Sequence, residues 1–371
     1  FKYGKNKMKP FKPEKLPLSC IDWERQISFI SQAHNLLGKY EGMLQTIVNP
    51  NLFLSPLTTQ EAVLSSKIEG TQATLDEVLR YEANPKMTLS PEKNADIQEI
   101  LNYRKAISYA VERLKSIPLS LNLIKDVHSI LMNSVRGMNK TPGEFRKVQN
   151  YIGPPGADIS QATYIPPSPE EVMPAMDNLE KYIHYEEKDT IVQLAIIKAQ
   201  FEIIHPFLDG NGRIGRILIP LFLFYKNIIS KPVFYLSTYL EKHRDEYYQH
   251  LNNITAKNDW NGWISFFLKA VIEQAKMNIE KAGAIQNLYD QMKITIPEIT
   301  GSKYSMQLTE ALFISPLFSI NGLSIASMIP KATIIRIVNI LKNKKIVIEI
   351  QKSRGPMPGL FMFKALYNIV K

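Results

Sequence analysis

Hydrophobic side chains recur along most of the chain at the spacing of an amphipathic helix. Apolar residues at positions i, i+3, i+4 and i+7 line one side of such a helix. This spacing predicts helices over residues 23–44, 91–114, 120–135, 169–185, 190–204, 211–225, 240–256 and 260–289. The body of the chain is therefore predicted to be mainly α-helical.

Two shorter helices are predicted from the residues at their ends. Thr58 and Thr59 are candidate N-caps of a helix that ends at Gly70. Thr74 and Glu77 have the spacing of a capping box, in which each side chain bonds to the backbone N–H of the other residue. The next helix is therefore expected to begin near Thr74 and to stop before the following proline.

Proline and glycine mark two segments that lack a helical pattern. The opening residues through Pro17 contain three prolines and are expected to form an extended arm. Residues 137–169 are rich in glycine and proline, which predicts a loop with room for short strands at 148–152 and 163–165.

The C-terminal residues combine short helices with strand patterns. Helices are predicted at 307–313, 324–328 and 331–344, and β-rich stretches at 345–351 and 360–363, with a turn at 353–356 between them. This order is typical of a winged helix-turn-helix domain, in which a basic helix enters the DNA major groove and a basic hairpin meets phosphates. Such domains also serve in dimerisation or protein docking, and the sequence leaves both uses open.

The length and composition fit a globular protein of several domains. At about 100–200 residues per domain, a chain of 371 residues corresponds to two or three domains. We expect an N-terminal helical region at 1–115, a helical core at 116–290 and the winged helix-turn-helix domain at 291–371. A hydrophobic content of 45% and a charged content of 22% exclude a disordered, collagen-like or disulfide-scaffold protein.

Cysteine content and hydropathy bear on the compartment. The single cysteine, Cys20, cannot form an internal disulfide, which fits a reducing cytoplasm. The longest uninterrupted apolar stretch, 217–225, has nine residues, whereas a membrane span needs about 20. No signal peptide is evident, because prolines interrupt the N-terminal lysines. We therefore expect a cytoplasmic protein without a membrane partner.

The net charge of +10 is concentrated at the two ends of the chain. Residues 1–15 contain six Lys and one Glu, and residues 321–371 contain nine Lys and Arg and one acid. Between these segments, 30 basic side chains are balanced by 33 acidic ones. A basic terminal domain fits nucleic-acid binding, but a solubilising surface gives the same signal.

Residues 205–216, with the sequence HPFLDGNGRIGR, contain more candidate catalytic and binding residues than any other segment of the chain. Pro206 disfavours helix at His205, so a helix is expected to end there and a glycine-rich loop to lead into a new helix near Asn211. Glycines at positions 210 and 212 let backbone N–H groups approach an anion at the positive end of that helix. The segment therefore predicts an anion-binding turn.

Polar side chains of the same segment complete the predicted site. Arg213 and Arg216 are three residues apart, so both can face the same anion. Asp209 is a natural ligand for Mg²⁺, and His205 can exchange a proton near neutral pH. The spacing predicts a triphosphate site with a metal ion and a general base.

Other interpretations of this segment fit less well. Gly210, Gly212 and Gly215 match G-x-G-x-x-G, but a dinucleotide-binding fold needs a strand before this motif and an acid about 20 residues after it. The preceding run 190–204 is too long for a typical strand, and the first acid that follows is Glu241. No G-x-x-x-x-G-K-[ST] phosphate loop is present. A purely structural loop with a capping Asp would not need all twelve positions.

Residues 205–216 resemble the signature of the Fic family, H-x-F-x-[DE]-G-N-G-R-x-x-R, at every specified position. The resemblance extends over about residues 55–285 and includes the segments PGEFR at 142–146 and YIPP at 164–167. It implies a helical fold. It also implies protein adenylyl transfer, in which AMP moves from ATP to a Ser, Thr or Tyr hydroxyl of a target protein.

The resemblance implies a role for each residue of the signature. His205 would be the general base on the incoming hydroxyl, and Asp209 would hold Mg²⁺ between the α- and β-phosphates. Arg213 and Arg216 would bind the outer phosphates. The anion hole would be formed by Gly210, Asn211 and Gly212.

Two further elements of the ATP and target site are implied by the resemblance. The loop of Gln161, Ala162, Thr163 and Tyr164 resembles the family's flap, a β-hairpin that holds the target segment by strand addition. Tyr247 resembles the residue that lines the adenine pocket. We count these five residues with the ATP-binding set.

Residues 65–70, SSKIEG, resemble the family's inhibitory motif, [ST]-x-x-x-E-[GN], within the predicted helix 58–70. Ser65 and Glu69 are four residues apart and are expected to share a helix face, with Gly70 following. The resemblance implies that Glu69 pairs with Arg216 and blocks the γ-phosphate, because a buried carboxylate competes with phosphate for one guanidinium. In some relatives the same Glu orients a water and AMP is removed, so both directions stay open.

Three functions remain open from the sequence. The first is an autoinhibited adenylyltransferase that acts on ATP, on an unnamed target protein and on itself. The second is a DNA-binding regulator whose core senses a nucleotide. The third is another chemistry of the family, such as phosphate transfer or toxin activity, although phosphate-transferring relatives replace the glycine that stands here as Gly212. A homodimer is left open. The other histidines are interpreted as structural or surface residues: His34, His128, His184, His243 and His250.

Overall fold

The computed structural model describes residues 9–46, 50–134, 138–153, 156, 158–355 and 357–371, with backbone only at 50–54 and 138. It divides into two compact units. Unit 1 contains Phe1–Leu37 and Lys105–Gln274, and unit 2 contains Gly38–Arg104 and Ala275–Lys371. The divisions fall inside α1 (Trp23–Thr46), α4 (Pro91–Leu114) and α11 (Trp260–Thr300). The three consecutive domains expected from the sequence stay a prediction.

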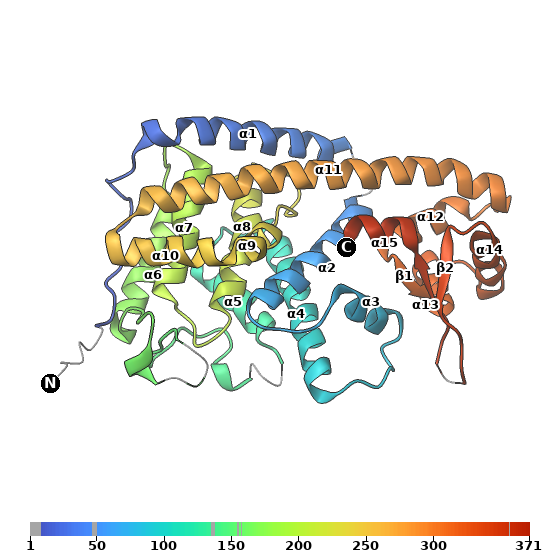
Figure 1. Ribbon diagram of the computed structural model, residues 1–371, viewed down its shortest axis with the longest axis horizontal. Coiled ribbons are helices and arrows are strands. Elements are labelled where there is room, and N and C mark those ends of the chain that lie inside the picture. The colour runs from blue at the N-terminus through green and yellow to red at the C-terminus, as the bar shows by residue number, and fades with distance from the viewer. Residues whose placement is uncertain (1–8, 47–49, 135–137, 154–155, 157, 356) are drawn as a thin grey trace. The chain divides into compact units, whose positions relative to one another are not determined.

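Unit 1 is organised around α7 (Thr190–Ile204). Every residue of α7 except Thr190 and Glu202 is buried, which explains why its sequence is apolar on all sides. α6 (Pro169–Ile183) and α8 (Asn211–Tyr225) pack against it (Figure 1). The other elements confined to this unit are α5 (Leu121–Leu131), α9 (Ser237–Lys242), α10 (Arg244–Lys257), η1 (Met138–Lys140) and η2 (Ile159–Gln161).

The N-terminal arm of unit 1 is extended where the structure describes it. Residues 9–17 form no helix, and the Phe11 N–H donates to the Ile165 carbonyl at 2.9 Å. The Asn178 side chain bonds to both the N–H and the carbonyl of Leu16, at 2.8 and 2.9 Å. This confirms the expected arm over residues 9–17, while residues 1–8 lie outside the described part of the chain.

The start of α7 is capped by a carboxylate that also binds a histidine. Asp189 Oδ1 accepts from the N–H groups of Ile191 and Val192 at 3.0 and 2.9 Å. Its Oδ2 lies 2.6 Å from His34 Nε2 on α1. The hydrogen bond to Asp189 raises the pKa of His34 above its ordinary value of 6.5, against the opposing effect of burial.

The His34–Asp189 pair predicts a pH-dependent contribution to stability. Because the pKa of His34 is raised in the folded state, its contribution is fully present below pH 6.5 and is lost as pH rises through the folded value. The pair is partly exposed, so we expect about 1 kcal/mol or less. Urea unfolding from pH 5.5 to 9 should show the advantage over His34→Gln shrinking as pH rises. An advantage that does not change with pH would contradict this.

Unit 2 combines helices with a small antiparallel sheet. Its N-terminal helices include α2 (Pro50–Ile68) and α3 (Leu75–Ala83). The C-terminal elements are α12 (Ser305–Ile314), β1 (Leu317–Ser319), α13 (Ile320–Ser327), α14 (Lys331–Asn343), β2 (Val347–Gln351), β3 (Leu360–Phe363) and α15 (Lys364–Val370). The strand order is β1-β3-β2, with Phe318 opposite Phe361 and Val347 opposite Phe363.

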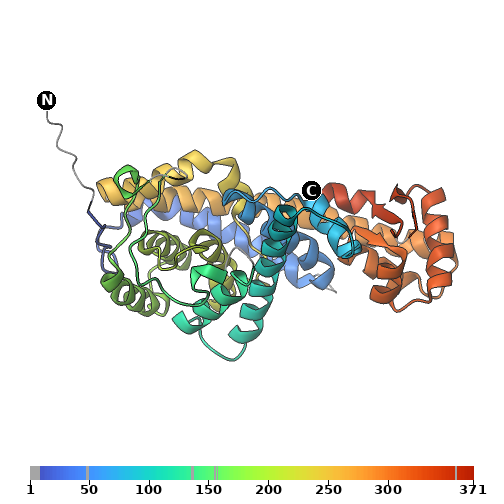
Figure 2. The same cartoon turned by 90° about the horizontal axis from the view of Figure 1, so that it is seen from below.

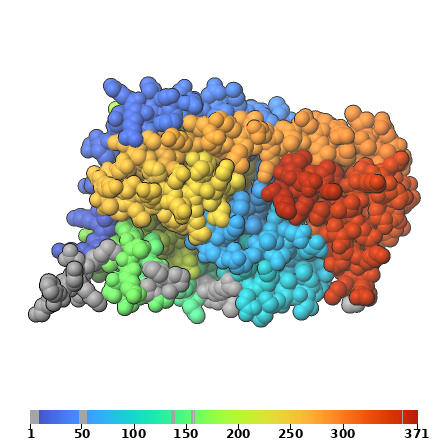
Figure 3. Space-filling model, in the orientation of Figure 1, coloured from blue at the N-terminus to red at the C-terminus, as the bar shows by residue number. Residues whose placement is uncertain are grey.

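The C-terminal elements of unit 2 form one body that packs on its N-terminal helices (Figures 2 and 3). α12 and α15 contact α2, and β1 contacts α3. The Gln60 side chain of α2 donates to the Lys371 carbonyl at 3.0 Å and accepts from Lys281 Nζ at 2.8 Å. The buried Glu61 accepts from the Tyr103 hydroxyl at 3.0 Å. α2 is therefore held on several sides within its own unit.

Several predicted element boundaries are wrong. α2 begins at Pro50, so Thr58 and Thr59 lie inside it rather than at its N-cap. Pro56 within the helix obscured this start. The predicted helix 240–256 is two helices, α9 and α10, with His243 between them at a non-helical φ of −111° and ψ of 38°. β1 and α15 were not predicted from the sequence, because three and seven residues are too few for a periodic pattern.

Two sequence expectations concern membranes and thiols. Within the described ranges, no single helix is long and apolar enough to cross a membrane. α13 and α14 reach the required hydropathy only when taken together, and they are bent by 114°. Cys20 is exposed and not in a disulfide.

Candidate active site

The segment 205–216 forms the turn between α7 and α8 together with the start of α8, as the sequence predicted. α7 ends at His205, which has a left-handed backbone with φ 49° and ψ 59°. α8 begins at Asn211, after Gly210 with φ 79°. A left-handed conformation at a residue other than glycine costs about 1–3 kcal/mol, so surrounding contacts must hold His205 in place.

Arg146 supplies those contacts. Its Nε donates to the His205 carbonyl at 2.9 Å, and its backbone N–H donates to the Pro206 carbonyl at 2.8 Å. The remaining guanidinium N–H groups donate to three other backbone carbonyls, those of Val148, Pro167 and Ile204. Arg146 is only 3% exposed, and burial lowers its pKa to about 10, so it stays charged at neutral pH.

Asn211 and Phe207 close the turn from the inside. Asn211 Oδ1 accepts from the Phe207 N–H and its Nδ2 donates to the Phe207 carbonyl, both at 2.8 Å. Asn150 Nδ2 donates to the same carbonyl at 3.1 Å. The Phe207 ring is fully buried. The Asn211 side chain thus fixes the turn.

His128, on α5, packs against the turn and bonds to it. It is fully buried, and its ring stacks on Phe207 with centroids 3.7 Å apart. Burial lowers its pKa to about 4, so it is neutral at pH 7. Its Nδ1 accepts from the Gly143 N–H at 2.9 Å, so Nε2 carries the proton and donates to the Asp209 carbonyl at 3.0 Å.

Gly210 in the turn and Gly215 in α8 are required for different reasons. Gly210 needs its positive φ, and a Cβ there would lie 3.0 Å from Met132 Sδ and 3.5 Å from His128. A Cβ on Gly215 would lie 2.6 Å from Glu202 Oε1. Gly215 therefore allows close packing of α8 on α7 and is not part of a dinucleotide fingerprint, because α7 rather than a strand precedes the motif.

Charged side chains occur just before α8 and in its first two turns. Arg213 and Arg216 are buried, with 5% and 2% exposure. Arg213 donates to Asp209 Oδ1 at 3.3 Å, and the Gly210 N–H bonds to the same oxygen. The Asp209 side chain is 47% exposed. The turn thus presents two buried guanidinium groups and one accessible carboxylate.

The donor set suits Mg²⁺ only together with a substrate. The described residues contain no group of three or more His, Cys, Asp or Glu side chains placed to hold a metal ion. Asp209 therefore offers a single carboxylate. Mg²⁺ is commonly held by one or two carboxylates plus substrate phosphates, so the turn fits an ion that arrives with a nucleotide.

The His205 imidazole is oriented by its own helix. Nδ1 lies 3.3 Å from the Glu202 carbonyl, and the ring is partly buried. A carbonyl can only accept, so Nδ1 carries the proton in the neutral ring. Nε2 is then the nitrogen with the basic lone pair.

Tyr247 lies in a buried polar cluster close to α7. Its hydroxyl accepts from Lys198 Nζ at 3.0 Å, and the buried Lys198 also forms an ion pair with Glu202. The Tyr247 ring is 2% exposed and packs near Trp263. The structure thus places Tyr247 in the same unit as the turn, and its contact with adenine stays a prediction.

The predicted flap contains one β-bridge. Ile152 pairs with Tyr164, with the Ile152 N–H donating to the Tyr164 carbonyl at 2.9 Å. Gln161 closes η2 and is exposed, Ala162 is half-buried, and Thr163 is exposed and bonds to the Ile152 carbonyl. The Tyr164 hydroxyl donates to the Ile203 carbonyl at 2.8 Å, which ties the flap base to α7. The strands 148–152 and 163–165 are otherwise irregular, and residues 154, 155 and 157 lie outside the described part.

Ser65, Glu69 and Gly70 lie at the end of α2, in unit 2. Ser65 is fully buried within the helix. Glu69 follows the last helical residue and is exposed, so the expectation of a shared helix face and a buried carboxylate is wrong. Gly70 has φ 100° and ends the helix, with its N–H donating to the Lys67 carbonyl at 2.9 Å.

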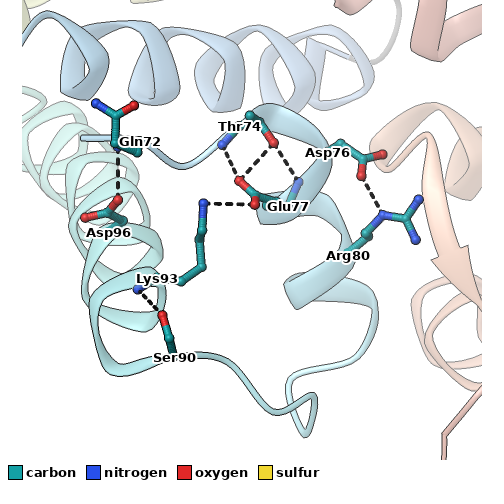
Figure 4. A network of polar contacts seen from close by, with 8 residues as sticks. All are labelled: Gln72, Thr74, Asp76, Glu77, Arg80, Ser90, Lys93 and Asp96. Atoms are coloured by element: carbon teal, nitrogen blue, oxygen red, sulfur yellow. Dashed lines mark hydrogen bonds and ion pairs between the residues drawn. The ribbon is translucent and has the colours of Figure 1, made fainter. Parts of the chain in front are cut away.

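The chain after Gly70 is held by a polar network (Figure 4). The Gln72 N–H donates to Asp96 at 3.0 Å, and Thr74 and Glu77 form the predicted capping box of α3. Lys93 forms an ion pair with Glu77 at 2.9 Å. The C-terminal turn of α2 is therefore followed by a segment fixed to α4.

Sequence reasoning missed two residues that shape the turn. Arg146 was noted only as part of the family-like segment PGEFR, and His128 was assigned to the structural or surface histidines. Their partners at the turn lie 59 and 81 residues away along the chain. A histidine among buried apolar residues at helical spacing was the one available signal for His128, because such a ring needs polar partners.

Sequence comparison places two family profiles on the chain. The profile of the Fic/DOC family N-terminal region matches residues 27–112, and that of the Fic/DOC family matches residues 118–223. The first covers α2, and the second contains the whole segment 205–216.

Curated relatives carry one activity name. A protein of Aquifex aeolicus, named a probable protein adenylyltransferase, is 28% identical over 179 residues, which cover 48% of this chain and 51% of the relative. The protein adenylyltransferase Fic of Drosophila mojavensis is 25% identical over 256 residues, covering 67% of this chain and 44% of the relative. The chain thus spans about half the length of these relatives.

Solved structures share the fold at low identity. A Fic family protein from Desulfovibrio desulfuricans G20 has a TM-score of 0.58 and 19% identity, and covers 96% of this chain and 98% of its own. A Fic domain containing signaling protein from Bacteroides thetaiotaomicron has a TM-score of 0.55 and 17% identity, over 68% of this chain and 97% of its own. These structures show the fold, and the two profile matches, over residues 27–112 and 118–223, show that the chain belongs to the Fic/DOC family.

Proposed function

We propose that the chain transfers AMP from ATP to a Ser, Thr or Tyr hydroxyl of a target protein. The observation that supports this best is the turn between α7 and α8, which contains a histidine, a carboxylate and a helix N-terminus and is followed in α8 by two buried arginines. The curated relatives named protein adenylyltransferases support this activity.

His205 acts as the general base. With its Nδ1 proton donated to the Glu202 carbonyl, Nε2 accepts the proton of the incoming hydroxyl. The hydroxyl oxygen forms a bond to the α-phosphorus of ATP. The bond from that phosphorus to the bridging oxygen breaks, and pyrophosphate leaves with the electron pair. Arg146 holds the strained backbone of His205, so the base is positioned before the substrate arrives.

The N-terminus of α8 binds the phosphates. In this proposal the backbone N–H groups of Gly210, Asn211 and Gly212, at the positively polarised start of α8, bind the phosphates. The Gly210 N–H exchanges its bond to Asp209 Oδ1 for one to a phosphate oxygen. Arg213 and Arg216 neutralise the outer phosphates from buried positions, where charge interactions are screened less than in water. Asp209 would hold Mg²⁺, which when bound supplies positive charge to the phosphate oxygens.

The flap and Tyr247 complete the site in this proposal. The target segment adds as a strand beside the Ile152–Tyr164 bridge, in the loop Gln161–Tyr164. Exposed apolar side chains around this bridge support contact with a partner: Val148, Tyr151, Ile152 and Ile159. Tyr247 lines the adenine pocket.

Glu69 acts as a brake by competing with the γ-phosphate for Arg216, with Ser65 and Gly70 shaping the helix end. The match of the N-terminal family profile to residues 27–112, which contain α2, supports this role. We also propose that the C-terminal elements form a winged helix-turn-helix domain, and that residues 1–115, 116–290 and 291–371 act as three functional domains, whose bounds differ from those of the two compact units. A cytoplasmic location and a homodimer are part of the same hypothesis.

Glu69→Gly is expected to raise AMP transfer by at least about tenfold, because removing one charge-assisted competitor worth about 1.5–3 kcal/mol frees a guanidinium for phosphate. The measurement is transfer of label from α-labelled ATP with Mg²⁺, scored on the chain itself and on added host proteins. Glu77→Gln, which removes a carboxylate from the same unit, is the matched control and should leave the rate unchanged.

An unchanged rate of AMP transfer in Glu69→Gly would contradict inhibition by Glu69. Removal of AMP is the alternative direction. It would show as loss of label from a premodified protein that depends on Glu69, with no transfer by either form of the chain.

A further inference from the structure

The C-terminal elements of unit 2 have the connectivity of a helix-turn-helix with a hairpin. α12, β1, α13, α14, β2 and β3 follow in this order, and β3 lies between β1 and β2 in the sheet. α13 and α14 are bent by 114° across a short break. Two helices at about 90–120° joined by a short turn are the DNA-contacting unit of such folds, whose second helix enters the major groove.

α14 has two faces of different chemistry. Its inner face packs in the core through Ile334, Ile337, Val338 and Leu341. Its outer face is exposed and consists of Lys331, Ala332, Ile335, Arg336, Asn339 and Asn343. Positions 331, 335, 339 and 343 are four residues apart, and 332 and 336 lie beside them, so the six residues form one stripe along the helix.

The outer stripe carries the side chains that read base edges. Arginine bonds two acceptors of guanine, and asparagine bonds the acceptor and donor of adenine. Apolar side chains such as those of Ala332 and Ile335 contact the methyl group of thymine. The stripe contains no acid, and the described structure shows no hydrogen bond or ion pair from the side chains of Arg336 or Asn339.

The surroundings of α14 favour an anionic partner. Residues 321–371 contain nine basic side chains and one acid, Glu349. Glu349 is already ion-paired with Lys342 at 3.0 Å. Lys352 and Arg354 are exposed on the turn between β2 and β3, next to the Arg354–Met357 bridge. This turn is therefore a basic hairpin end whose side chains can contact phosphates.

We propose that these elements bind double-stranded DNA, with the outer face of α14 in the major groove and Lys352 and Arg354 on the phosphate backbone. This function is independent of the proposed AMP transfer. The side chains of α14 that face outward set the sequence preference, and the hairpin residues set affinity without sequence preference.

A protein partner is the competing class. Ile325 and Met328 at the turn between α13 and α14 are 79% and 89% exposed, which fits an apolar contact. The excess of positive charge and the two asparagines on α14 favour DNA.

The first test uses the full chain and a labelled duplex of about 30 random base pairs, without ATP, followed by fluorescence anisotropy. Binding near 50 mM salt should weaken at least about tenfold at 200 mM, because phosphate contacts release counterions. Arg336→Glu should weaken binding by about tenfold or more. Arg25→Glu, the same charge change at an exposed residue of α1, should change it by about twofold or less.

The second test separates reading of bases from contact with phosphates. After enrichment of bound duplexes from the random pool, Asn339→Ala should relax the preference at one base pair by about 5–150-fold. Lys352→Ala should weaken all duplexes alike and reduce the slope of log affinity against log salt by about 1.

Three outcomes would overturn the proposal. The first is no duplex binding near 50 mM salt by a folded chain. The second is an equal loss in Arg336→Glu and Arg25→Glu, which would assign binding to overall charge. The third is self-association that Ile325→Ser with Met328→Ser abolishes, in a chain that binds no duplex; this would make the surface a protein interface.

Discussion

His205→Ala in the Glu69→Gly chain is expected to lower the rate of AMP transfer by about 10²–10⁴-fold, the range typical for loss of a general base. ATP binding should stay within about threefold, because phosphate contacts come from α8 and its arginines rather than from the imidazole. The measurement combines a rate assay with labelled ATP and a separate binding titration. A large loss of rate with binding retained assigns His205 to the proton transfer.

Two control variants separate loss of the base from loss of folding. His205→Asn keeps a residue type that tolerates the left-handed backbone, so a folded protein is expected even if the alanine variant is unstable. His184→Ala removes an exposed histidine of the same unit and should leave the rate unchanged. Transfer by both His205 variants at the parent rate would contradict the assignment of the base.

Arg146→Met is expected to destabilise the protein by about 3–4 kcal/mol and to abolish transfer. The guanidinium satisfies four backbone carbonyls, those of Val148, Pro167, Ile204 and His205. Methionine has a similar length but no donor, so these buried acceptors would lose their partners. His205 would also lose the contacts that hold its left-handed backbone. Unfolding in urea measures the stability, and labelled ATP measures the activity.

Lys147→Met is the matched control for this prediction. It removes the same charge at the next residue, but Lys147 is 86% exposed and its ion pair with Glu144 is worth about 1 kcal/mol or less. Arg146→Lys should fall between the two, because one ammonium can reach only some of the carbonyls. Equal stability of the two methionine variants would show that Arg146 does not hold the turn.

The central helices of the candidate site could be predicted because their signals are local. Asp189 and the run to Ile204 define α7, and Pro206 with the following glycines places the start of α8 at Asn211. The capping box at Thr74 and Glu77 likewise depends on residues three positions apart. In each case the atoms that fix the boundary lie within one helical turn of it.

The support of the turn could not be predicted because it is non-local. Arg146 and His128 act on backbone carbonyls 59 and 81 residues away, and nothing in their neighbourhoods marks those partners. The start of α2 was missed for a different reason. Pro56 normally ends a helix pattern, and here the helix continues on both sides of it because α2 packs against α12 and α15.

The phosphate of ATP that carries the label distinguishes AMP transfer from transfer of the γ-phosphate. The Glu69→Gly chain is incubated with Mg²⁺ and ATP labelled at either the α- or the γ-phosphate, and protein and released phosphates are separated. We expect protein-bound label from α-labelled ATP only, with pyrophosphate released in equal amount. Protein-bound label from γ-labelled ATP, or no transfer by a folded chain that binds ATP, would contradict this expectation.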